Sequence, residues 1–248
     1  LGVAVALQFG VNYANDYSDH RRGADDAGRV GPRRASGSGV VSPRSVLLAA
    51  TVSFSLAASL GIWLASLSSW WLIPAGAVCI LAAAGYTGGP FPYGYRGYGE
   101  LAVFLFFGEV ATCGTVFVES GRVPLAAPFA AILPGALAAA VLLINNIRDI
   151  DTDRAAGKRT LAVMLGRARA RRLYLGLLGL AMAVPLILAI PALARAEVLL
   201  VWVSVPLLEG PVRNSGSDRP EDLIRGLKQT AGLLLLACTL LAVGLWMG

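Results

Sequence analysis

Residues 124–153 read PLAAPFAAILPGALAAAVLLINNIRDIDTD, an apolar stretch that ends in a cluster of amides, carboxylates and one arginine. The apolar part is long enough to cross a bilayer as a helix, because about 20 apolar residues span the hydrocarbon core. A similar arrangement occurs at the start of the sequence, where residues 1–11 lead into the run NYANDYSD at 12–19. The sequence therefore predicts membrane helices whose ends carry acidic clusters.

The composition supports a membrane protein throughout. The chain is 56% hydrophobic and 15% charged, with a mean hydropathy of +0.66, whereas soluble domains carry roughly 25% charged residues. We expect an all-α, polytopic transmembrane helix bundle that forms a single domain over 1–248. Eight apolar windows predict its spans, at 1–14, 45–66, 70–86, 100–118, 124–146, 172–192, 197–209 and 230–247.

The basic residues predict the orientation. When the loops are assigned alternately to the two sides, one side holds 19 of the 21 Lys and Arg residues. The positive-inside rule places that side in the cytoplasm, so both acidic clusters are expected on the cytoplasmic face of the cell membrane. Residue 1 then lies outside, partway into a helix, and we expect a preceding first helix to be missing. Because the excess of basic residues is accounted for by this membrane topology, we expect no nucleic-acid partner.

The spacing of the acidic clusters indicates bound divalent metal. If the helices continue through the clusters, four pairs lie one helical turn apart and share a face: Asn12 with Asp16, Asn15 with Asp19, Asn145 with Asp149, and Asp149 with Asp153. Clustered carboxylates repel one another unless a cation lies between them, and hard oxygen ligands suit Mg²⁺. Mg²⁺ also takes phosphate oxygens, which points to a diphosphate ligand. Cations near the second acidic cluster could bind such a diphosphate, and one of them is Lys158, although the chain has only two lysines and 19 arginines. Each arginine by itself could equally be a solvated charge that sets the membrane topology.

Several segments resemble the UbiA superfamily of intramembrane aromatic prenyltransferases. The resemblance lies in Asn15-Asp16-x-x-Asp19 with Asp25, and in the run Arg148–Thr160. Three further segments, Arg29–Pro32, Tyr86–Gly94 and Asn145–Asp149, are similar to the 1,4-dihydroxy-2-naphthoate polyprenyltransferases of menaquinone synthesis. The resemblance implies nine membrane helices around a central cavity, and eight of them can be recognised in this sequence.

The resemblance also implies roles for individual residues. Asp16, Asp19, Asp149 and Asp153 would hold Mg²⁺ that bridges a polyprenyl diphosphate, with Asn12, Asn15 and Asn145 binding substrate or orienting the cluster. Arg148, Lys158 and Arg159 would contact phosphate, and Lys158, Arg148 and Asp149 would serve catalysis. Tyr86, Tyr93 and Tyr95 are candidates to position the aromatic ring, although interfacial aromatic residues of a membrane helix explain each one equally well.

The implied reaction transfers a polyprenyl group to 1,4-dihydroxy-2-naphthoate, with loss of CO₂ and diphosphate. One alternative is a related enzyme with another aromatic acceptor, such as 4-hydroxybenzoate. A less favoured alternative is an ion-coupled transporter, because the acidic clusters are expected at one face and transporter sites lie near the midplane. Glu109, in the middle of a predicted span, departs from the family pattern. A functional role and a structural role as a protonated, hydrogen-bonded group stay equally open for it.

Overall fold

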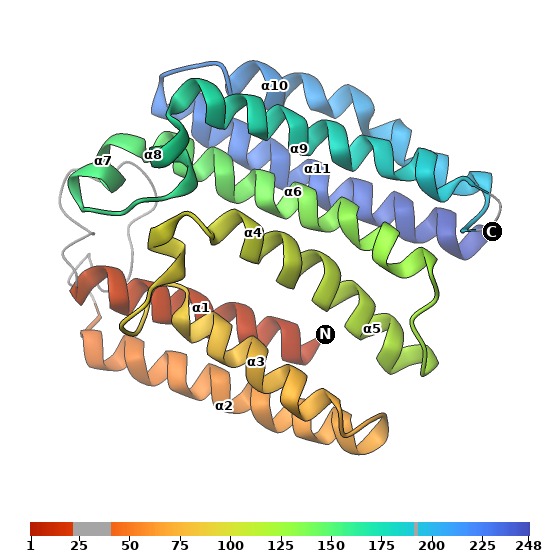
Figure 1. Ribbon diagram of the computed structural model, residues 1–248, viewed down its shortest axis with the longest axis horizontal. Helices are drawn as coiled ribbons and strands as arrows, with labels where there is room; N and C mark the ends of the chain where they lie inside the picture. Colours follow the sequence, from red (N-terminus) through yellow and green to blue (C-terminus); the bar gives the residue numbers. More distant parts are fainter. Residues whose placement is uncertain (22–40, 191–192) are drawn as a thin grey trace. The chain divides into compact units, whose positions relative to one another are not determined.

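The computed structural model describes residues 1–21, 41–190 and 193–248 (Figure 1). These ranges contain helices and no strand, which confirms the all-α prediction. Asp25 and the segment Arg29–Pro32 lie outside the described residues. Contacts gather in two compact units, Leu1–Tyr98 with Thr152–Arg159, and Gly99–Asp151 with Thr160–Gly248. The single-domain organisation and the central cavity stay predictions.

The first unit is built from α1 (Gly2–Arg21), α2 (Pro43–Leu67) and α3 (Leu72–Gly85), followed by the short 3₁₀ helix η1 (Tyr93–Arg96). α2 begins at Ser42, whose hydroxyl accepts a hydrogen bond of 3.2 Å from the Ser45 amide, a typical N-cap. α1 approaches α2 closely where Gly10 faces the ring of Phe54, since a Cβ on Gly10 would lie 2.6 Å from that ring. This contact fixes α1, which carries the first acidic cluster.

The second unit is organised around α6 (Ala126–Arg148), and 61% of its apolar window is buried, against 33% for α9. α6 packs against α9 (Arg167–Leu188) and α11 (Pro220–Met247), as Figure 1 shows in green, teal and blue. It also packs against the π-helical turn η2 (Phe104–Val110), which joins α4 (Gly99–Val103) to α5 (Ala111–Ser120). The unit also contains α8 (Leu161–Leu165), the 3₁₀ helix η3 (Ala196–Leu208) and α10 (Glu209–Asn214), while α7 (Ile150–Ala155) begins in the second unit and ends in the first.

Five described helices are long and apolar enough to cross a membrane: Pro43–Leu67, Gly99–Ser120, Ala126–Arg148, Arg167–Leu188 and Pro220–Met247. They coincide with five of the eight predicted windows. The windows at 1–14, 70–86 and 197–209 correspond to α1, whose second half is polar, to α3 with 14 residues, and to η3 with 13. The polytopic helical bundle is therefore confirmed, while the sidedness of its loops stays a prediction.

A close backbone contact in the second unit joins two glycines, Gly108 of η2 and Gly135 of α6. A Cβ on Gly108 would lie 2.7 Å from the Gly135 Cα and 2.8 Å from the Ala131 carbonyl oxygen. Lipid tails are as apolar as leucine, so membrane helices associate through close packing, which small residues permit. This contact therefore sets the register of the α4–η2–α5 segment on α6.

We expect Gly108→Ala to lower the unfolding temperature of the purified protein in detergent, because overpacking a tight contact costs about 1–3 kcal/mol. Gly114→Ala is the matched control, since a Cβ on Gly114 has nothing within 4 Å. Thermal unfolding followed by circular dichroism measures both variants. Equal unfolding temperatures would show that the glycine contact does not constrain the helices.

Candidate active site

The first acidic cluster lies on α1 in one continuous helix, as the sequence predicts. Asp16 and Asp19 are buried, with exposed fractions of 7% and 1%, whereas Asn12 is exposed. Asn15 Oδ1 accepts a hydrogen bond of 2.8 Å from the hydroxyl of Thr87, in the loop after α3. α1 thus presents two buried carboxylates beside an anchored amide.

Asp19 is the centre of a polar group that we call the Asp19 cluster, made of Asp19, Tyr95 and Lys158. The Tyr95 hydroxyl donates to Asp19 Oδ1, and Lys158 Nζ donates to Asp19 Oδ2 at 3.1 Å. Lys158 Nζ also lies 4.8 Å from the centroid of the Tyr95 ring, within the range of a cation–π interaction. A buried carboxylate is costly unless it is paired and hydrogen-bonded, and these two residues supply that compensation.

A glycine turn brings Lys158 to Asp19. Gly157 has φ of 72°, and the amide of Lys158 donates to the carbonyl of Asp153 at 2.8 Å, as in the turn that commonly ends a helix. The next amide, of Arg159, donates to the Tyr95 carbonyl at 2.9 Å. The backbone therefore holds both partners of Asp19 in place, while the Arg159 side chain remains exposed.

Tyr86 and Tyr93 shape the loop that carries Tyr95. Their rings meet edge to face, with centroids 5.4 Å apart, and the Tyr93 hydroxyl donates to the Ala82 carbonyl at 2.7 Å. Burial raises the pKa of the Tyr93 phenol above its ordinary value, so the group stays a neutral donor. Gly94 is needed here because a Cβ would lie 2.8 Å from the Tyr86 carbonyl oxygen. The predicted contact of these rings with an aromatic substrate stays a prediction.

The second acidic cluster forms its own hydrogen-bond network at the end of α6. Arg148 donates to both carboxylate oxygens of Asp149, at 2.7 and 2.6 Å, and to Asn145 Oδ1 at 2.9 Å. Asn145 Nδ2 donates in turn to Asp149 Oδ2 at 3.5 Å. The predicted pairing of Asn145 with Asp149 across one turn is therefore confirmed, with Arg148 as an additional partner of both.

The condition for pairing Asp149 with Asp153, a helix that continues through the second cluster, is not met. α6 ends at Arg148, Asp149 has ψ of 8°, which lies outside the helical range, and α7 begins at Ile150. Asp149 and Asp153 therefore do not share one face of a regular helix. The Asp151 side chain is exposed and forms an ion pair of 3.6 Å with Arg167.

The sequence did not single out Glu100, which the structure buries in the first turn of α4 with an exposed fraction of 5%. Glu100 Oε1 accepts a hydrogen bond of 2.9 Å from Asn146 Nδ2, next to the second cluster. The sequence feature that could have indicated Glu100 is a carboxylate at the start of an apolar span, because ionisable residues in such spans usually have a partner. Glu109, in the middle of the same apolar span, has a weak 3.9 Å contact with the Cys113 thiol.

The buried carboxylates Asp16 and Asp19 are hard oxygen donors of the kind that Mg²⁺ takes. Within residues 1–21, 41–190 and 193–248, no three acidic, histidine or cysteine side chains form a ready-made metal site. Asp16, Asp19 and Asp153 belong to the first unit and Asp149 to the second. The four-carboxylate Mg²⁺ site stays a prediction.

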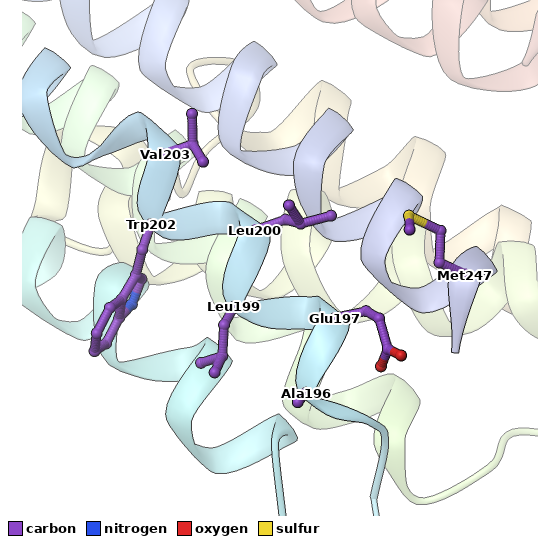
Figure 2. A pocket seen from close by; sticks show the side chains of 7 residues that line it. All are labelled: Ala196, Glu197, Leu199, Leu200, Trp202, Val203 and Met247. Carbon is purple, nitrogen blue, oxygen red and sulfur yellow. The ribbon is translucent and has the colours of Figure 1, made fainter.

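An apolar hollow elsewhere in the second unit contains none of the predicted site residues. Figure 2 shows its lining side chains along η3 and at the end of α11: Ala196, Glu197, Leu199, Leu200, Trp202, Val203 and Met247. All but one of these side chains are apolar.

A sequence model of the UbiA prenyltransferase family matches residues 1–213, which include both acidic clusters. The chain is 58% identical over 174 residues to 1,4-dihydroxy-2-naphthoate octaprenyltransferase of Mycobacterium tuberculosis, covering 70% of this chain and 59% of the relative. It is 32% identical over 243 residues to the protein of the same name from Bacillus subtilis, covering 96% and 77%. It is also 35% identical over 165 residues to digeranylgeranylglyceryl phosphate synthase of Halobacterium salinarum, covering 65% and 54%.

The Asp19 cluster predicts a charge-dependent loss of stability. Lys158→Met should lower the free energy of unfolding by roughly 3 kcal/mol, because removing one partner of a buried ion pair leaves an uncompensated charge. Lys158→Met with Asp19→Asn should recover most of that loss, since no unpaired charge remains. Arg159→Met is the matched control at an exposed neighbour, and thermal unfolding in detergent measures all three variants. A double variant no more stable than Lys158→Met alone would contradict the ion-pair interpretation.

Proposed function

Because the chain belongs to the UbiA prenyltransferase family, we propose that it transfers a polyprenyl group from polyprenyl diphosphate to 1,4-dihydroxy-2-naphthoate, releasing CO₂ and diphosphate. The observation that carries this proposal is the family match over residues 1–213, which contains both acidic clusters, Tyr95 and Lys158. The mycobacterial and Bacillus relatives are named 1,4-dihydroxy-2-naphthoate octaprenyltransferases, which supports this acceptor. The chain spans 59% of the length of the mycobacterial relative.

The proposed reaction breaks the bond between the allylic carbon and the diphosphate oxygen, and the electron pair leaves with diphosphate. The ring carbon that bears the carboxylate forms the new carbon–carbon bond, and the carboxylate departs as CO₂, returning its bonding electrons to the ring. The products balance as a prenylated dihydroxynaphthalene, CO₂ and diphosphate. In menaquinone synthesis this prenylated product is demethylmenaquinol.

The residues of the two clusters would act on the diphosphate end of the substrate. Mg²⁺ held by Asp16, Asp19, Asp149 and Asp153 would supply positive charge to offset the negative charge that develops on the leaving group. Arg148 and Lys158 are cations already fixed beside two of these carboxylates, at 2.6 and 3.1 Å. Fixed charges of this kind stabilise a transition state without reorganisation.

The membrane helices would serve the other end of the substrate. The chain is a multi-pass membrane protein, so a polyprenyl tail can remain in an apolar environment while its diphosphate meets the polar clusters. Exclusion of water protects an allylic carbocation from hydrolysis. We also propose that the protein lies in the cell membrane with both clusters on the cytoplasmic side. When the loops are assigned alternately to the two sides, 19 of 21 basic residues fall on the side of the clusters, and the positive-inside rule assigns such a side to the cytoplasm.

The acceptor can be identified by direct competition. We expect purified full-length protein in lipid vesicles to prenylate 1,4-dihydroxy-2-naphthoate at least tenfold faster than 4-hydroxybenzoate, with a product mass that shows loss of CO₂. Mass spectrometry with prenyl diphosphates of several lengths measures acceptor and chain length together. Preferred use of 4-hydroxybenzoate, or of a glycerol phosphate acceptor, would replace the proposed acceptor. Coupled ion flux without prenyl transfer would support a transporter.

The metal requirement is a separate test. We expect activity to disappear with EDTA and return with Mg²⁺, and Asp16→Asn or Asp19→Asn to lower the rate at least about 100-fold, the scale of one lost charge-stabilising group. Glu209→Gln is the matched control, because this carboxylate is exposed and pairs only with Arg213 at 3.4 Å among the described residues. Full activity after chelation, or in both aspartate variants, would contradict a Mg²⁺ site at the first cluster.

A further inference from the structure

Glu100 and Asn146 form a buried polar pair between α4 and α6, outside the groups assigned to substrate or metal. Their exposed fractions are 5% and 8%, and one hydrogen bond of 2.9 Å joins Asn146 Nδ2 to Glu100 Oε1. The second carboxylate oxygen, Oε2, is buried and has no hydrogen-bond partner within the described residues. Leaving a buried carboxylate oxygen unpaired costs free energy, so a contribution to stability does not by itself account for the Glu100–Asn146 pair.

The surroundings of this pair are held rigidly. Eight residues beyond Glu100, Gly108 meets Gly135 of α6 so closely that neither position has room for a Cβ. This contact fixes how far the α4–η2–α5 segment can slide along α6. The Glu100–Asn146 hydrogen bond adds a second fixed point eleven residues further along α6, in its last turn. Two fixed points determine both the register and the rotation of that turn.

The last turn of α6 is also the part that carries the second cluster. Asn145 and Asp149 are one turn apart and share Arg148 as a donor. Asn146 is adjacent in sequence to Asn145, so its side chain leaves the helix about 100° around the axis, which follows from 3.6 residues per turn. A rotation of the turn that breaks the Asn146 hydrogen bond would therefore redirect all three side chains of the network.

We propose that the Glu100–Asn146 pair is a positioning element of the transfer site, which fixes the rotation of the end of α6 and with it the direction of Asn145, Arg148 and Asp149. Buried polar pairs that cost stability and specify register are known uses of such groups. This inference rests on the proposed function, because it matters for the reaction only if the second cluster acts on the diphosphate.

The decisive variant replaces both partners by apolar residues of similar size, Glu100→Met with Asn146→Leu. Replacing both members of a buried hydrogen-bonded pair can be neutral or stabilising, so we expect an unfolding temperature in detergent equal to or above that of the unchanged protein. We expect kcat to fall at least tenfold, with a smaller change in KM for the prenyl diphosphate. Glu100→Gln keeps an acceptor for Asn146 and should retain most of kcat.

The matched control removes another buried pair of the same unit, Tyr174 with Thr230, whose hydroxyls are 2.6 Å apart between α9 and α11. Tyr174→Phe with Thr230→Val should leave kcat within twofold. A Glu100→Met and Asn146→Leu variant that keeps kcat within twofold, or that unfolds well below the unchanged protein, overturns the proposal. Absence of prenyl transfer to dihydroxynaphthoate by the unchanged protein would instead refute the proposed function.

Discussion

A carboxylate buried in an apolar helix bundle has to be hydrogen-bonded and neutralised, and the first unit is arranged around this requirement at Asp19. Tyr95 and Lys158 meet it from two segments that lie 76 and 139 residues away along the chain. A glycine turn at Gly157 and a backbone hydrogen bond from Arg159 to Tyr95 hold these partners in place. The same features place a positive charge beside a carboxylate of the first cluster.

In the second unit the carboxylate of Asp149 is neutralised by an arginine instead of a lysine. Arg148 is next to Asp149 in the sequence and donates two parallel hydrogen bonds to it, a geometry that a guanidinium allows and an ammonium does not. Each acidic cluster therefore has its own fixed cation. For the proposed transfer of a prenyl group, this means that positive charge is available at both clusters before a diphosphate arrives, which is the preorganisation that electrostatic catalysis requires.

Two kinds of contact hold α6 against the α4–η2–α5 segment: close packing of small residues and a buried polar pair. Gly108 and Gly135 bring two helices into backbone contact, while Glu100 and Asn146 join the same helices near the second cluster. Close packing supplies attraction in a membrane, where the hydrophobic effect between helices is absent. The polar pair adds direction, because a hydrogen bond tolerates less rotation than an apolar contact does.

The sequence by itself determined the all-α class, the membrane environment and the two acidic clusters, because apolar length and the one-turn spacing of polar residues are local properties. It also determined the pairing of Asn145 with Asp149. It did not determine where α6 ends, because the break at Asp149 depends on backbone angles that spacing does not encode. Only the tertiary structure decided that Lys158 and Tyr95 converge on Asp19 and that Glu100 meets Asn146. These contacts join residues 46 to 139 positions apart, and helix packing, which no local pattern reports, brings them together.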